Sequence, residues 1–236
     1  MTLQLMIAPE IFTQFPSYCR GVVIAHGIHN GKSSEDLITL LRAAEASTAS
    51  QLSPDAILTH PRIASWREAY RQAGVKPSDF RPSVEALARR VVRKDPLPAI
   101  NAIVDIGNLA SIQAMLPIGA HAIDVLIQDM QLRPATGEES FEAFGSEAVE
   151  HPFPSEIIFV EGSTVLTRRW TWRQAKHTLV VPETTAVEIN VDGLSPVSQG
   201  EVVRICTELV ELVRKYCGGK VRYGIVSRES PGIELS

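Results

Sequence analysis

The sequence predicts an α+β fold in which a helical N-terminal part packs on a β-rich second half, with a long helix near the C-terminus. Three observations support this prediction. Amphipathic helix patterns dominate residues 33–94, short strand patterns dominate residues 124–193, and a strong apolar helical stripe runs through residues 198–219. Helices and strands do not alternate regularly, which disfavours a parallel βαβ arrangement. We expect one compact domain over residues 1–236.

The first half begins with a short β-branched segment and continues with helices. Residues 21–28, "GVVIAHGI", have the composition of a buried strand. A helix is expected after Ser33 or Ser34, either of which can act as its N-cap. Two further amphipathic helices are expected around 65–74 and 81–94. The apolar segment 99–116 repeats with a period near 3.6 and is interpreted as another helix.

The second half is mostly strand-like. Residues 124–136 alternate, and residues 156–174 predict two strands joined by the turn signal "EGS". Residues 177–194 predict two more short strands. A helix over 198–219 and a last strand over 220–227 complete the pattern.

Composition and charge limit the possible classes of protein. The chain is 44% hydrophobic and 21% charged, has a net charge of −4, and has no apolar segment of the ~18 residues that a membrane helix needs. The N-terminus shows no signal-peptide pattern. Its cysteines, Cys19, Cys206 and Cys217, form no CxxC pair, which favours reduced thiols and a cytoplasmic location.

Charge is uneven along the chain. Between Arg62 and Lys94 there are seven arginines and two lysines against three acidic residues, a local excess of +6. Such a segment on an acidic protein can bind a phosphate backbone, or it can simply form solvated helix faces.

Several common catalytic patterns are absent from the sequence. "HNGKSS" matches a phosphate-binding loop only in "GKS", because its first glycine would fall at His26. His26 and His29 lack a third ligand at a suitable spacing, so no metal and no other cofactor are expected. In "RRWTWRQ", Trp170 and Trp172 are expected on one face of a strand, suited either to nucleotide stacking or to the core.

Four segments in order give the chain a resemblance to a known family. They are "PAINAIVDIGNL" (98–109), "PIGAHAID" (117–124), "GEESFEAFG" (137–145) and "RRWTWRQ" (168–174). The chain resembles free-standing B3/B4 domain proteins, which are similar to the editing module of the phenylalanyl-tRNA synthetase beta subunit. The resemblance is best over about residues 61–190.

The resemblance implies a trans-editing hydrolase that deacylates mischarged aminoacyl-tRNA, an ester hydrolase without a cofactor. By resemblance, His121 and Asp124 belong to the loop that lines the editing pocket. An aminoacyl ester is already activated, so the protein need only orient water and stabilise the oxyanion. A neutral histidine can accept a proton from water or bind the terminal ribose, although His121 could equally be a structural residue.

The substrate-binding residues implied by the resemblance are Glu138, Arg173, Gln174 and Glu188. The acid that reads the tyrosine hydroxyl in the synthetase falls at Glu188 or at Asn190 here, and Arg173 and Gln174 replace glycines. Acidic residues near these positions suit a cationic side chain. The candidate substrates are therefore an arginine analogue such as canavanine on arginine tRNA, or tyrosine on phenylalanine tRNA. The acids are Asp124, Glu138, Glu139, Glu188 and Asp192.

The expected partner is the aminoacylated 3′ end of tRNA, with an aminoacyl-tRNA synthetase as a further candidate partner and no membrane. The expected tRNA contacts are Arg67, Arg71, Arg89, Arg90, Arg168 and Arg169. Two alternatives stay open, a non-catalytic tRNA-binding module and a small-molecule enzyme on the same fold. A cavity containing His121 with basic surface at its mouth would distinguish the hydrolase from both.

Overall fold

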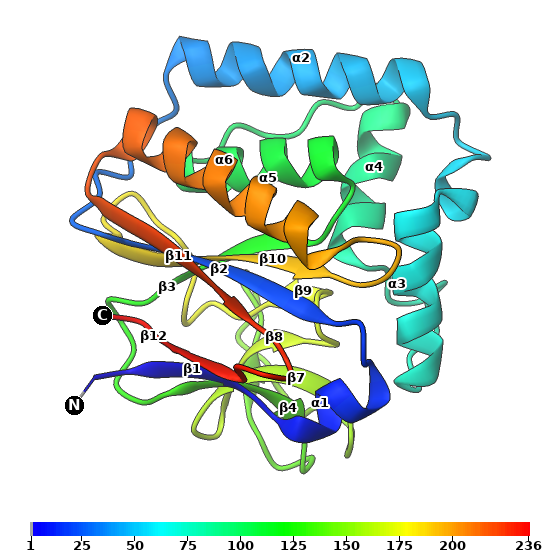
Figure 1. Ribbon diagram of the computed structural model, residues 1–236, viewed down its shortest axis with the longest axis vertical. Helices are drawn as coiled ribbons and strands as arrows, with labels where there is room; N and C mark the ends of the chain where they lie inside the picture. Colours follow the sequence, from blue (N-terminus) through cyan, green and yellow to red (C-terminus); the bar gives the residue numbers. More distant parts are fainter. Residues whose placement is uncertain (1) are drawn as a thin grey trace.

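The computed structural model describes residues 2–236 as three layers (Figure 1). Helices cover one face of a four-stranded sheet, and a six-stranded sheet covers its other face. The helices are α1 (Pro9–Gln14), α2 (Glu35–Gln51), α3 (Pro61–Gln72), α4 (Ser83–Val92), α5 (Ala102–Ala114) and α6 (Gln199–Cys217), with a 3₁₀ turn η1 (Ile57–Thr59). The α+β prediction and the terminal helix are confirmed.

The four-stranded sheet has the order β11-β2-β10-β3 and is antiparallel throughout. Its strands are β2 (Cys19–His26), β3 (Ile118–Ala122), β10 (Ala186–Gly193) and β11 (Lys220–Val226). Alternate residues of these strands face opposite layers. One face, which includes Val23, Ile189 and Val191, packs into the core under the helices. The other face points at the second sheet.

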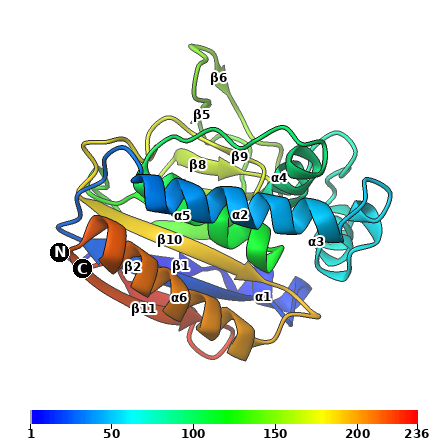
Figure 2. The same cartoon turned by 90° about the horizontal axis from the view of Figure 1, so that it is seen from above.

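The six-stranded sheet has the order β12-β1-β4-β7-β8-β9. Its strands are β1 (Gln4–Ile7), β4 (Met130–Pro134), β7 (Ile157–Glu161), β8 (Thr164–Arg168), β9 (Arg173–Gln174) and β12 (Gly232–Glu234). A separate pair, β5 (Phe141–Glu142) and β6 (Val149–Glu150), stands off this sheet (Figure 2). Val22, Ile24, Leu132 and Phe159 belong to the core between the two sheets.

The ends of the longer helices follow the local signals in the sequence. Ser34 caps α2 by accepting a hydrogen bond from the backbone N–H of Leu37. Ser198 and Glu201 form a capping box at the start of α6. From above, α2, α5 and α6 lie over the sheet, and α5 contacts both of the other two (Figure 2). The packing of α6 on α5 and on the sheet buries the apolar stripe from which this helix was predicted.

Two strand predictions are wrong. Residues 169–172 form a turn between β8 and β9, and Arg169 and Trp170 have positive φ values of 47° and 64°. Trp170 and Trp172 therefore do not share a strand face. Residues 177–194 contain one strand, β10, and not two. The short elements β1 and α1 were not predicted from the sequence.

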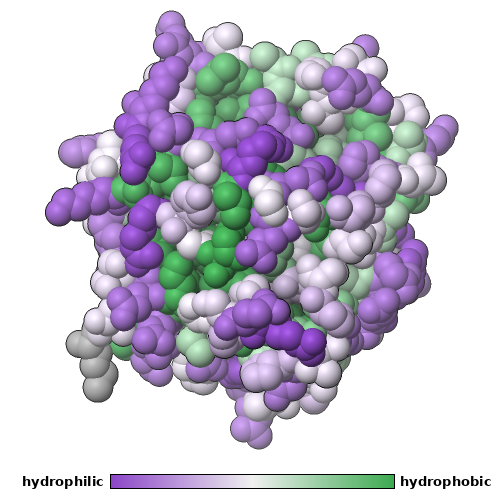
Figure 3. All heavy atoms as spheres, in the orientation of Figure 1, coloured by the Kyte–Doolittle hydropathy of each residue, from purple (hydrophilic) through white to green (hydrophobic). Residues whose placement is uncertain are grey.

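The surface, the helices and the cysteines each add one observation. On the face seen in Figure 1, hydrophobic patches are separated by hydrophilic side chains (Figure 3). None of the helices in residues 2–236 is both long enough and apolar enough to cross a lipid bilayer. Cys19, Cys206 and Cys217 are all free and buried.

Candidate functional site

A cavity of about 150 Å³ lies between the two sheets where β3 faces β9. We call it the His121 cavity. Its wall combines β3, the turn after β8, and side chains from β2 and β10 that face the space between the sheets. The lining residues are Arg20, Ser83, Pro117, Ile118, Gly119, Ala120, His121, Phe159, Thr167, Trp170, Thr171, Trp172, Arg173, Gln174 and Asn190.

His121 is held firmly in this wall and is only 4% exposed. Its Nδ1 lies 2.7 Å from Thr178 Oγ1, and its Nε2 lies 3.3 Å from Thr167 Oγ1. The ring stacks on Phe159 with centroids 5.7 Å apart. Burial and the nearby Arg20 guanidinium lower the pKa of His121 to about 3. The imidazole is therefore neutral at physiological pH, able to accept or donate a hydrogen bond.

Arg20 forms the centre of a buried charge cluster behind the cavity. Its Nη1 lies 2.9 Å from Asp192 and its Nη2 lies 3.1 Å from Glu188. The guanidinium also lies over the ring of Phe159, 4.1 Å from its centroid. All three charged side chains are at most 2% exposed. Burial lowers the pKa of Arg20, but the two carboxylates outweigh it, so Arg20 stays protonated.

Glu188 and Asn190, the two candidate positions for the pocket acid, differ in their access to the cavity. Both belong to β10 and face the same side, but only Asn190 lines the cavity. Glu188 is completely buried and is the cross-strand neighbour of His121. Burial raises the pKa of Glu188 to about 7, against the opposing effect of Arg20. Asn190 donates a hydrogen bond to Asp192, which fixes its amide at the wall.

The expected cluster of acids at the pocket does not form. Asp124 accepts hydrogen bonds from the Thr185 backbone N–H and hydroxyl, so it ties the end of β3 to the start of β10. Glu138 is in an exposed turn, and Glu139 pairs with Arg133. Asp124 and Glu139 therefore satisfy local needs of the backbone or of an arginine, and Glu138 is exposed. None of the described residues that line the cavity carries a carboxylate.

Arg173 and Gln174 do line the cavity, as predicted. Gln174 Nε2 donates to the carbonyl oxygens of Ala120 and Thr178, both at 2.9 Å, so it braces the His121 strand. Arg173 is 43% exposed and lies 3.6 Å from Glu150. Of the two arginines that line the cavity, Arg173 is the one exposed to solvent.

The arginines expected to contact tRNA fall into two groups. On α3 and α4, Arg67 and Arg89 share the buried Glu85, while Arg71 pairs with Glu68 and Arg90 with Asp95. Arg168 and Arg169 are buried, 3% and 5% exposed, and both contact Glu156. Their burial argues against the phosphate contact that the sequence suggested for these two residues.

Three groups at or beside the cavity were missed in the sequence, and only Arg20 gave a weak signal there. Arg20 is the one charged residue in the otherwise apolar stretch "CRGVVIA". Thr178 lies in a segment expected to be a strand, and its hydroxyl is the close partner of His121. Ser83 reaches the cavity because its backbone N–H donates to the Thr171 carbonyl. That contact between distant segments leaves no trace in a single sequence.

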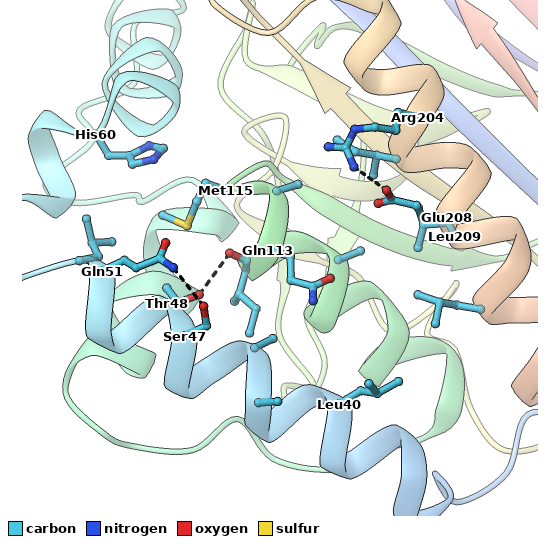
Figure 4. Close-up of a pocket in the computed structure, with 18 residues that line it drawn as sticks. Leu40, Ser47, Thr48, Gln51, His60, Gln113, Met115, Arg204, Glu208 and Leu209 are labelled. Carbon is cyan, nitrogen blue, oxygen red and sulfur yellow. Dashed lines mark hydrogen bonds and ion pairs between the residues drawn. The ribbon is translucent and has the colours of Figure 1, made fainter.

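A second cavity, of about 820 Å³, opens on the helical face between α2, α5 and α6 (Figure 4). We call it the α2–α6 cavity. Two polar pairs in its wall are local, since Arg204 pairs with Glu208 and Gln51 donates to Ser47, whereas His60 Nδ1 in the same wall is buried without a hydrogen-bond partner among the described residues. None of the residues predicted for the site lies here. Within residues 2–236 no group of three His, Cys, Asp or Glu side chains is arranged to hold a metal ion.

Comparison with known families places the chain among B3/4 domain proteins. The B3/4 domain family matches residues 65–218, which is more than half of the chain. The chain belongs to this family. The elements outside the matched region are integral to the same sheets, because β2 and β11 pair with each other and β2 pairs with β10. The family resemblance expected from the sequence is confirmed.

One solved structure similar to the chain is an N-terminal fragment of the phenylalanyl-tRNA synthetase beta-subunit from Pyrococcus horikoshii. The identity is 12% and the TM-score is 0.46, over 94% of this chain. The chain spans about half of that fragment, 51% of its length. No curated protein matches the chain.

Proposed function

We propose that the protein is an aminoacyl-tRNA deacylase that acts in trans on mischarged tRNA. The observation that supports it most strongly is His121, a neutral, immobilised imidazole in the wall of a small cavity whose lining also includes two buried donors without partners in the described part of the chain, Arg20 Nε and Trp170 Nε1. The family membership and the match of "PIGAHAID" to the pocket loop add to this support. A hydrolase for an activated ester needs little more than such positioning.

The role proposed for His121 is to position water or the terminal ribose. A histidine whose pKa is about 3 is a weak base, so its contribution is directional hydrogen bonding rather than storage of a proton. Thr178 fixes one ring nitrogen, and Nε2 lies 3.3 Å from Thr167 Oγ1, so a water or hydroxyl in the cavity can be bound beside this pair by either group. The proton released from water can pass to the leaving ribose oxygen, so no charged intermediate of the histidine is needed.

Asp124 acts indirectly in this proposal. It anchors the backbone that follows His121 and does not line the cavity. It is therefore a positioning residue, and the cationic-group contact that the sequence suggested for it is not part of the proposal.

The lining of the cavity bears on which amino acid is removed. Its charged residues are Arg20 and Arg173, and both are positive. A side chain that arrives with a full positive charge meets these arginines before any carboxylate. Of the two candidates, tyrosine suits this lining because its hydroxyl can form a hydrogen bond with Asn190. An arginine analogue suits it only in an uncharged form.

A panel of charged tRNAs tests the proposal. Tyrosine and phenylalanine on phenylalanine tRNA, and canavanine and arginine on arginine tRNA, are incubated with the protein, and ester loss is followed over time. We expect at least one mischarged tRNA to lose its amino acid while its correctly charged counterpart survives. Tight binding of tRNA without any ester loss would favour the binding-module alternative.

A further inference from the structure

The mouth of the His121 cavity carries an excess of positive charge that is organised around three glutamates. Glu85 is shared by Arg67, Arg81 and Arg89. Glu150 and Glu156 are shared by Arg168, Arg169 and Arg173. Six arginines thus face three glutamates, which leaves three positive charges in these two networks.

The two networks meet beside the cavity. The backbone N–H of Ser83 donates to the carbonyl of Thr171 at 3.1 Å, which joins the start of α4 to the turn after β8. The rings of Phe80 and Trp172 contact edge to face, with centroids 4.9 Å apart. The guanidinium of Arg169 lies over Phe80 at 3.6 Å. Residues 80–83 and 169–173 therefore form one surface.

The excess charge is exposed at two of the six arginines. Arg67, Arg168 and Arg169 are mostly buried, and Arg89 bonds Glu85 at 2.8 Å. Arg81 and Arg173 are 49% and 43% exposed, and they lie 3.9 and 3.6 Å from the nearest glutamate oxygens, without a hydrogen bond to them. Loosely paired, exposed guanidinium groups can exchange their carboxylate for a phosphate at little cost.

Trp172 adds an aromatic surface beside Arg173 and Phe80. It lines the cavity, is partly exposed, and lies within 5.8 Å of the Arg173 guanidinium. Aromatic rings beside arginines are the usual means of holding unpaired nucleotides, since bases stack on the ring while the cations hold the phosphates. A duplex would not present an unstacked base to this ring.

We propose that Arg81, Arg173 and Trp172 form a rim that binds the single-stranded 3′ end of an RNA. The two arginines contact backbone phosphates and Trp172 stacks with a base. This proposal rests on the proposed function, because it names how the substrate of that same site is held. It replaces the buried Arg168 and Arg169 as phosphate contacts.

Binding of uncharged tRNA at several salt concentrations tests the rim without requiring hydrolysis. The variant Arg81→Gln/Arg173→Gln should bind about tenfold more weakly. The slope of log affinity against log salt should decrease by about 0.7 for each lost contact with a single-stranded phosphate, or about 1.4 for both. The matched control is Arg204→Gln/Arg214→Gln, two α6 arginines that are 59% and 53% exposed. The control should keep both affinity and slope.

The aromatic contact gives a different signature. Trp172→Leu should lower affinity about tenfold with little change in the salt slope, because stacking releases no counterions. Trp172→Phe should restore part of the affinity, which separates stacking from a general effect on folding. An acceptor-stem hairpin without its unpaired 3′ nucleotides should bind all rim variants and the wild type equally weakly.

The outcomes separate the rim from the proposed function. Folded rim variants that bind uncharged tRNA with the wild-type slope would overturn the rim, even if the protein deacylates tRNA. A wild-type protein that shows the expected slopes but hydrolyses no aminoacyl ester would retain the rim and contradict the deacylase.

Discussion

The α2–α6 cavity and the His121 cavity differ in size and in chemistry, and the smaller of these two has the features of a functional site. The α2–α6 cavity has a volume of about 820 Å³, whereas the His121 cavity has about 150 Å³. In the larger one, Arg204 and Gln51 pair with neighbours one helical turn away, as on any helix surface, and burial and Arg62 lower the pKa of His60. In the smaller one, side chains from six separate stretches of the chain converge, and two completely buried groups at or beside it have pKa values shifted to about 3 and about 7. Convergence of perturbed polar groups identifies a site better than volume does.

The largest expected effect is on stability and comes from the buried charge cluster. Arg20→Met leaves Glu188 and Asp192 buried without their shared cation. Breaking a buried ion pair by removing one partner costs about 3–5 kcal/mol of unfolding free energy. Urea denaturation measures it. The comparison with the other cavity is Arg204→Met, which removes an exposed pair and should cost less than about 1 kcal/mol. Equal losses in the two variants would contradict the contrast between the cavities.

The next effect is on catalysis. His121→Ala should lower deacylation of a good substrate by about 10²-fold or more, which is the scale of a positioned acid–base group. Binding of uncharged tRNA should be nearly unchanged. The matched control is His60→Ala, because His60 lines the α2–α6 cavity. Steady-state rates with both variants check the prediction. A fully active His121→Ala protein with an unchanged melting temperature would remove this histidine from the mechanism.

The third effect is a pH dependence of stability that comes from two buried groups at the His121 cavity. The folded pKa of Glu188, about 7, exceeds its unfolded value of 4.5, so the folded state holds an extra proton between these values. Glu188 therefore makes stability fall as pH rises through this window. The folded pKa of His121, about 3, lies below its unfolded value of 6.5, so its contribution rises with pH between 3 and 6.5. The two slopes oppose each other from pH 4.5 to 6.5.

Single variants should separate the two slopes. Relative to wild type, the unfolding free energy of Glu188→Gln should rise with pH between 4.5 and 7. That of His121→Gln should fall with pH between 3 and 6.5. One proton gives at most about 1.4 kcal/mol per pH unit. Denaturation curves at a series of pH values measure both, and parallel profiles for the two variants would contradict the assignment.

These predictions depend on residues that the sequence revealed to different degrees. The helices that cover the four-stranded sheet were predictable because local signals determine them: Ser34 and Ser198 cap α2 and α6, and the apolar stripe of α6 has a 3.6 period. The position of His121 at the site followed from the motif "PIGAHAID". Local pattern and family motif together placed the candidate centre.

The partners of His121 could not be predicted, because tertiary contacts decide them. Arg20 reaches the cavity through pairing of β2 with β10, 172 residues away from Asp192 along the chain. Several acids suggested a cationic substrate because they lie near the family motifs in the sequence. In the fold, Asp124 accepts hydrogen bonds from the backbone and Glu188 pairs with Arg20. Residues 169–172 looked like a strand because Arg, Trp and Thr alternate, but the chain reverses there with positive φ at Arg169. Composition cannot distinguish these outcomes.

The smallest expected effect comes from an exposed ion pair in the wall of the α2–α6 cavity. Glu208→Gln removes the charge that pairs with Arg204 across one turn of α6, where both side chains are more than half exposed. An exposed pair of this spacing contributes about 0.3–0.5 kcal/mol, and salt screens it further. We expect a change of that size in unfolding free energy at low salt, almost none at 1 M salt, and unaltered tRNA binding and deacylation. The measurement is urea denaturation at both salt concentrations, combined with the charged-tRNA panel. If Glu208→Gln instead impaired deacylation as strongly as His121→Ala, the large cavity would be part of the functional site, and volume would have been the better guide.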